Sequence, residues 1–143
     1  MDSIGLRVAL CLTFTIAGVL IVWTARAAAS GRLGRNPYAG IRTPTTMASD
    51  AAWTAAHRAG RPLTEIGGWL SILTGLGALA PMPEPMLTAL VGVGAACLLV
   101  FALTGAWIGV RAARETTPEP ELESEPESEP EQESESESES SEN

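Results

Sequence analysis

Three long runs of apolar residues stand out along the chain, and polar segments separate them. The first covers about 4–25, the second about 66–82 and the third about 86–110. An α-helix rises about 1.5 Å per residue, so roughly 20 apolar residues match the ~30 Å hydrocarbon core of a bilayer. The pattern therefore predicts an all-α membrane protein with three transmembrane helices, the second of which is short and rich in glycine.

The second and third runs are separated by Pro81, Pro83 and Pro85. Three prolines within five residues cannot continue a helix, because each lacks the backbone N–H that a helix interior requires. We therefore expect a tight turn here, with the two flanking helices forming an antiparallel hairpin.

The polar segment between the first two runs contains a helix start at Thr43-Pro44. Threonine is a good N-cap, and proline suits the first helical position. Gly60 and then Pro62 are typical of a helix end, so the prediction is a helix over about 44–59.

A helical wheel gives this predicted loop helix two different faces. One face is nearly all alanine, which suits close packing on other helices better than insertion into lipid. The opposite face places Trp53 and His57 one turn apart, with Asp50 two turns before His57. We expect an amphipathic helix at the membrane interface, whose polar face could form a hydrogen-bonded cluster with Arg42 or Asn36.

Charge divides the chain into two parts. Residues 1–114 contain all nine Arg and four acidic residues, a net charge of +5. Residues 115–143 contain thirteen Glu and no basic residue, and they alternate Glu with Ser and Pro. Such a sequence cannot bury enough apolar surface to offset the entropy of ordering. We therefore predict a membrane module over 1–114 and a disordered acidic tail over 115–143.

The placement of arginine also predicts an orientation. Six Arg lie between the first two runs and two more directly follow the third, whereas the Pro-rich turn contains only Glu84. The positive-inside rule then places the long loop and the C-terminus in the cytoplasm and the N-terminus outside. Trp23, Trp69 and Trp107 fall at the span ends that this topology places at the cytoplasmic face, as an aromatic belt would.

A cleaved signal peptide is the alternative interpretation of the first run. Ala27-Ala28-Ala29 resembles a small-residue cleavage site. The leading segment carries Asp2 against Arg7 and is not net positive, and the apolar run is longer than an ordinary signal core. These features favour a retained first span.

Catalytic and metal chemistry find little support in the sequence. The single His cannot build a metal cluster, and Cys11 and Cys97 lie in apolar runs without ligand spacing, so no cofactor is expected. Ser49 lies two turns from His57, too far to be its nucleophile. No charge sits in the middle of a span, which argues against a proton relay or ion pathway. We therefore predict that the protein is not an enzyme.

Small residues inside the spans allow helices to pack closely. Gly105 and Gly109 form a GxxxG motif, and Gly92 with Ala96 is a second pair of small residues at the same spacing. Packing within the chain is the preferred interpretation, and homodimerisation through the third span is the alternative.

Ten residues of the loop lie at fixed spacing: Asn36, Gly40, Ile41, Arg42, Thr46, Met47, Ser49, Trp53, His57 and Gly60. This set resembles the signature of the SdpI family of bacterial membrane proteins. Those proteins are named for immunity to a secreted sporulation-delaying toxin peptide, and their better-known members are longer, with additional spans. The resemblance implies a functional cluster made of Asn36, Gly40, Arg42, Thr43, Thr46, Ser49, Trp53, His57 and Gly60.

The resemblance favours an immunity or toxin-response protein of the bacterial cell membrane. For the better-known members it further implies membrane sequestration of a transcriptional repressor. The expected partners are the lipid bilayer and a peptide toxin or a regulatory protein, with homo-oligomers allowed and no nucleic acid.

Two other functions compete with this one. The first is a structural or accessory subunit of a membrane complex, suggested by the glycine-rich spans and the alanine face. A membrane enzyme or transporter ranks last. From the residues alone, the Trp53–His57 face fits a structural anchor at the headgroup level, or a site for a polar ligand, a lipid headgroup or a peptide.

Overall fold

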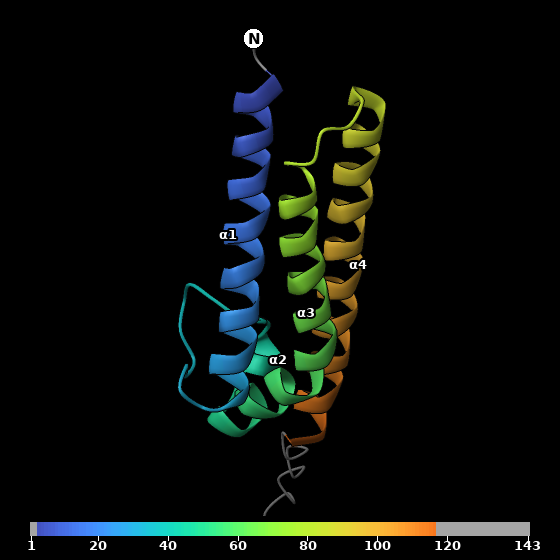
Figure 1. Cartoon of the computed structure of the whole chain (residues 1–143). Coiled ribbons are helices and arrows are strands. Elements are labelled where there is room, and N and C mark those ends of the chain that lie inside the picture. Colours follow the sequence, from blue (N-terminus) through green and yellow to red (C-terminus); the bar gives the residue numbers. More distant parts are fainter. Residues whose placement is uncertain (1–2, 117–143) are drawn as a thin grey trace, which may run out of the picture.

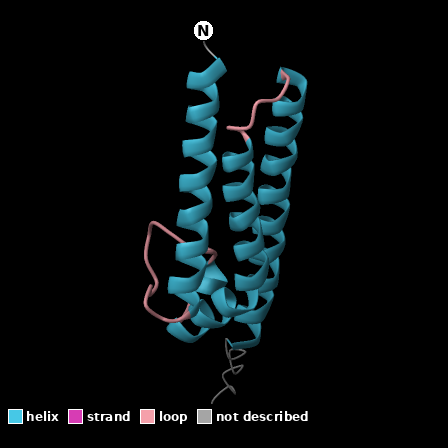
Figure 2. Ribbon diagram, viewed as in Figure 1, coloured by secondary structure: helices cyan, strands magenta, loops and turns pink. Residues whose placement is uncertain are grey.

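The computed structural model describes residues 3–116, and all its regular structure in that range is helical (Figure 2). The elements are α1 (Ser3–Ala29), α2 (Pro44–Met47), α3 (Asp50–Gly77) and α4 (Glu84–Thr116). The predicted all-α class is confirmed. The acidic tail predicted over 115–143 lies, apart from its first two residues, outside the described residues.

Helix α3 lies between α1 and α4 and packs along both of them (Figure 1). Over residues 3–116, no Cα atom of α1 lies within 8 Å of a Cα atom of α4. The two helices run in the same direction, and α3 runs the opposite way between them (Figure 1). The C-terminal ends of α1 and α4 therefore meet the N-terminal end of α3, and α2 and the long loop lie at that same end.

Glycine makes the close approach of these helices possible. A Cβ atom on Gly105 would lie 2.7 Å from the Thr64 hydroxyl, and one on Gly109 would lie 2.7 Å from the Ala56 carbonyl oxygen. On the other side of α3, a Cβ on Gly18 would lie 2.5 Å from the Gly68 carbonyl oxygen. The GxxxG motif of α4 thus packs on α3 within the same chain, whereas Gly92 faces open space.

Polar side chains join the helices at both ends of the bundle. The Arg7 guanidinium donates to the carbonyl oxygens of Ala78, Ala80 and Met82, which lie beyond the C-terminal end of α3. At the loop end, Arg26 of α1 pairs with Glu65 of α3 at 3.0 Å, and Glu65 also pairs with Arg61. The one charge in the first apolar run therefore satisfies carbonyl groups that the end of a helix leaves unpaired.

The predicted helix boundaries in the loop need correction. Thr43 is the N-cap and Pro44 begins the helix, as predicted, but α2 ends at Met47. The Ser49 hydroxyl then accepts the Ala52 N–H at 3.0 Å and starts α3, which continues through Gly60 and Pro62 to Gly77. The predicted helix over 44–59 and much of the span over 66–82 are therefore one element.

Two reasons explain why α3 does not stop at Gly60. Gly60 packs against α4, where a Cβ would lie 2.5 Å from the Gly105 carbonyl oxygen, so its missing side chain serves helix packing. Pro62 removes one helical hydrogen bond, a cost of about 3 kcal/mol. Parts of α3 before and after Pro62 are buried against α1 and α4, and this burial offsets the cost.

The prediction of three apolar spans is also corrected. Two helices are long and apolar enough to cross a membrane, Ile4–Ala29 and Glu84–Thr116. Helix α3 does not meet this criterion within the described chain. Its apolar part is short, contains Gly, Ser and Thr, and follows Arg58, Arg61 and Glu65.

Candidate functional site

Trp53 and His57 lie side by side in the interior, beneath the loop that precedes α2. Only 1% of Trp53 and 4% of His57 is exposed, and their ring centroids are 4.2 Å apart. Ala52 and Ala56 of α3 are also buried. The interpretation of Trp53 and His57 as anchors at the headgroup level is therefore wrong, because both rings face the protein.

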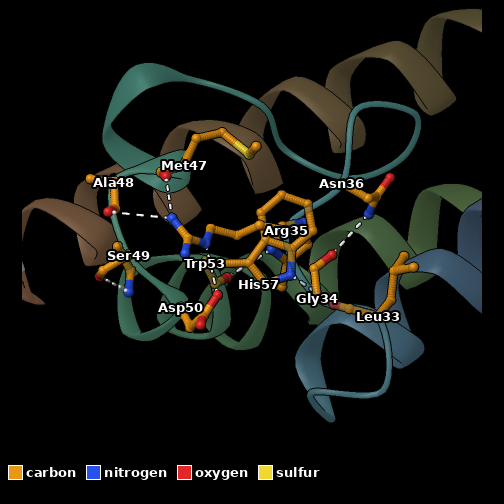
Figure 3. A network of polar contacts seen from close by, with 11 residues as sticks. Leu33, Gly34, Arg35, Asn36, Met47, Ala48, Ser49, Asp50, Trp53 and His57 are labelled. Carbon is orange, nitrogen blue, oxygen red and sulfur yellow. Dashed lines mark hydrogen bonds and ion pairs between the residues drawn. The ribbon is translucent and has the colours of Figure 1, made fainter.

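Both rings hydrogen-bond to the backbone. The Trp53 indole N–H donates to the Leu33 carbonyl oxygen at 2.8 Å (Figure 3). His57 Nε2 accepts the Ile41 N–H at 2.9 Å, so the ring proton lies on Nδ1, which donates to the Trp53 carbonyl oxygen at 2.8 Å. His57 is thus a neutral imidazole with both nitrogens occupied. Burial, which disfavours the charged ring, lowers the pKa of His57 below 6.5.

The backbone on each side of Arg42 is fixed. The Thr46 hydroxyl donates to the Ile41 carbonyl oxygen at 2.7 Å and accepts the Thr43 N–H at 2.9 Å. The Ile41 side chain reaches into the contact between α3 and α4, where its Cδ1 would lie 2.8 Å from a Cβ on Gly109. Arg42 itself is exposed, and its side chain makes no hydrogen bond or ion pair with any described residue.

Gly40 is required for this arrangement on two grounds. Its φ of +104° lies in a region that side chains rarely adopt. A Cβ on Gly40 would also lie 2.6 Å from His57 Nε2 and 2.8 Å from the Trp53 ring. The loop can pass over the two rings only because this position has no side chain.

Asn36 and Arg35 shape the first half of the loop. The Asn36 carboxamide oxygen accepts the N–H groups of Tyr38 and Ala39, both at 2.9 Å, which folds the chain into a turn. Arg35 pairs with Asp50 at 2.7 Å and donates to the Met47 carbonyl oxygen (Figure 3). The loop is therefore tied to the junction of α2 and α3.

The nine residues of the predicted cluster thus do not form one cluster, and they have different structural roles. Gly40, Trp53 and His57 meet, Thr43 and Thr46 lock the backbone beside Arg42, Ser49 caps α3, and Gly60 packs on α4. The expected hydrogen bonds of His57 with Asp50, Arg42 or Asn36 are absent from the described residues. Sequence reasoning missed Arg35, Leu33 and Ile41 as partners. Ile41 could have been found, because it is the one aliphatic residue larger than alanine between 34 and 46.

We call residues 30–63, the loop with α2 and the start of α3, the loop module. A cavity of about 590 Å³ lies beside it, between α1 and α4, and α3 also lines it. We name it the lateral groove. Residues 39–43 close its loop end, and α1 and α4 form its two walls. None of the residues that line it is acidic; they are Leu20, Ile21, Thr24, Ala25, Ala39, Gly40, Ile41, Arg42, Thr43, His57, Gly60, Arg61, Thr64, Ala102, Leu103 and Ala106.

The fold and the loop module define a small helical protein with two helices apolar enough to cross a membrane. The family model described as the SdpI/YfhL protein family matches residues 32–113, which is more than half of the chain. The chain belongs to this family, as its loop signature indicated. Neither the curated proteins nor the solved structures include a match to the chain.

Gly40→Ala should reduce the free energy of unfolding of the detergent-solubilised protein. Gly31→Ala is the matched control, since Gly31 also has positive φ, at +76°, but has nothing within 4 Å of its Cβ position. Both substitutions introduce backbone strain, whereas only a methyl group at position 40 would collide with His57 and Trp53. We expect Gly40→Ala to cost about 2 kcal/mol more than Gly31→Ala in thermal or denaturant unfolding. Equal losses would contradict the close packing of the loop on the two rings.

Stability should fall when His57 is forced to accept a proton. Its pKa is lowered in the folded protein, so the unfolded chain binds the proton more readily. The contribution of His57 is complete above about pH 6.5 and is lost as pH falls from there through the lowered pKa. Because the chain has one His, His57→Gln should reduce the change in melting temperature between about pH 7 and about pH 5. The same change in both proteins would show that His57 is not held neutral.

Proposed function

We propose that the protein acts in the bacterial cell membrane, where it confers immunity to a secreted peptide toxin or signals its presence. Family membership carries this proposal, because the matched residues 32–113 include nearly all of the loop module, helices α2 and α3, and most of α4. Immunity is the role that the resemblance to the SdpI family implies.

The fold supports a specific path through the bilayer. If α1 and α4 both cross in the same direction, α3 has to return the chain between them (Figure 1). Helix α3 can be less apolar than its neighbours, because α1 and α4 cover two of its sides. In this arrangement α3 returns the chain between α1 and α4, and the loop, α2 and the start of α3 lie at one membrane surface.

Charge supports the cytoplasm as the location of that module. The Arg residues of the loop, of the first half of α3 and of the end of α4 gather at one end of the bundle. At the other end Arg7 is occupied with carbonyl groups, and Glu84 begins α4. The positive-inside rule then gives an outside N-terminus and a cytoplasmic C-terminus.

The contacts of the module favour binding or signalling over catalysis. Both nitrogens of His57 are engaged by backbone groups, so it is not free to act as a general base. The Ser49 hydroxyl is occupied as the N-cap of α3. In contrast, the exposed guanidinium of Arg42 is held beside the lateral groove and is available to a partner.

A subunit of a membrane complex is the second candidate, and one observation favours it. Gly92 on α4 has nothing within 4 Å of its Cβ position, and the neighbouring Val93 is exposed. This open face could receive another helix, from a partner or from a second copy. The remaining glycine contacts of α3 and α4 are used within the chain, which makes this candidate weaker.

A toxin challenge tests the immunity proposal. Cells without the gene would be compared with cells that produce the wild type, Arg42→Gln or Arg32→Gln, at equal membrane levels confirmed by immunoblot. Both variants remove one exposed positive charge from the same loop, but only Arg42 borders the groove. Wild type and Arg32→Gln should raise the inhibitory concentration of at least one secreted peptide toxin, and Arg42→Gln should raise it less. Equal sensitivity of all strains across the toxin panel would contradict immunity.

A further inference from the structure

We propose that the lateral groove binds one anionic phospholipid, with an acyl chain between α1 and α4 and the phosphate at Arg42. The inference goes beyond immunity and does not depend on it. It rests only on the membrane path given above, in which α1 and α4 face lipid.

The shape and lining of the groove suit a hydrocarbon chain. Its walls are aliphatic, and Leu20 and Leu103 on opposite walls are 56% and 60% exposed. The Cα atoms of α1 and α4 stay more than 8 Å apart within residues 3–116, and the groove lies between these two helices. In the membrane path given above, both helices face lipid. The volume of the groove, about 590 Å³, lies within the usual ~300–1,000 Å³ of small-molecule sites.

The loop end of the groove has an uncompensated positive charge. Two arginines line the groove, and Arg61 is paired with Glu65. Arg42 makes no pair among the described residues, and no carboxylate lines the groove. A guanidinium binds phosphate through two parallel hydrogen bonds, and anionic lipids are enriched at the cytoplasmic surface. The charge therefore complements a phosphate group at the membrane surface.

The loop module holds Arg42 in place before any ligand arrives. Ile41 is fixed through its N–H, its carbonyl oxygen and its side chain, and Thr43 is fixed through its N–H. The backbone at Arg42 therefore loses little further freedom when a phosphate binds, and such preorganisation increases affinity. The signature residues therefore form a scaffold that positions one cation at the loop end of the groove.

A peptide fits the same groove less well than a lipid. The backbone N–H and C=O groups of a bound peptide would need partners, and unpaired polar groups are costly in an apolar site. The uncharged polar side chains of the lining are few: Thr24, Thr43, Thr64 and the already occupied His57. An acyl chain has no polar groups that need hydrogen-bond partners.

Lipid retention by the full-length protein tests the proposal. The protein would be reconstituted in vesicles with equal phosphatidylglycerol and phosphatidylcholine, extracted in mild detergent, and its retained lipids counted by native mass spectrometry. Wild type should retain phosphatidylglycerol in preference. Arg42→Gln should reduce this preference about tenfold, because it removes the positive charge that favours a net negative headgroup over a zwitterionic one. The control Arg32→Gln should leave it unchanged.

A second variant tests the acyl-chain part of the groove. Ala106→Leu fills the wall of α4 without removing a charge, so it should reduce phosphatidylglycerol retention while circular dichroism stays that of the wild type. Millimolar inorganic phosphate should not displace the lipid. Displacement by phosphate would mean a surface anion site and would overturn the proposal.

Other results would also overturn it. Equal retention of the two lipids by wild type, or unchanged retention in Arg42→Gln, would remove the role of Arg42. A peptide toxin to which the protein confers immunity could displace the lipid from wild type. If it did, and if Ala106→Leu abolished binding of that toxin, the groove would be a peptide site. Failure of the protein to sediment with membranes would instead contradict the membrane path, and loss of immunity alone would leave lipid retention as predicted.

Discussion

The hydrogen bond from the Ile41 N–H to His57 Nε2 is the interaction on which the loop module depends. It joins a segment without regular structure to a buried ring of α3, and it fixes the ring proton on Nδ1. Without it, a buried acceptor and the loop amide would both lose their partner, a cost of about 1–3 kcal/mol. Gly40 permits this contact, the tilted Trp53 ring packs against the imidazole, and Thr46 fixes the other side of Ile41.

Within the described loop and α3, the arginine side chains are bound to protein groups with one exception. Arg35 and Arg58 donate to backbone carbonyls near the ends of helices, where such groups lack helical partners. Arg32 donates to the Ser30 hydroxyl, and Arg61 pairs with a carboxylate of its own helix. Arg42 is the exception, because the module fixes its backbone while its side chain contacts none of the described charged groups. This contrast is the observation on which the proposed anionic ligand rests.

Much of the fold could be predicted from local sequence signals. The helix start at Thr43-Pro44 and the Pro-rich turn before α4 both depend on residues close in sequence. The end of the loop helix was predicted wrongly, because glycine can either end a helix or allow two helices to pack closely. At Gly60 the contact with Gly105, forty-five residues away, decides that the helix continues, and no local signal reveals that contact.

The site was harder to predict than the fold, for the same reason. The residue types and spacing indicated a cluster, but they suggested side-chain partners for His57. Its partners are backbone atoms, which every residue has, so composition cannot identify them. The wheel placed Trp53 and His57 away from the alanine face, and it could not show that the loop folds back to cover them.

Amide hydrogen exchange of Ile41, measured by NMR on the full-length protein in detergent micelles, tests this account most directly. The Ile41 amide belongs to a loop, but its bond to a buried ring should slow its exchange to a rate like that of the helical amides of α3. The exposed amide of Gly34 in the same loop provides the fast reference. Protection of Ile41 that disappears in His57→Ala, while α3 stays protected, would support the module as described. Exchange of Ile41 as fast as that of Gly34 in the wild type would contradict it.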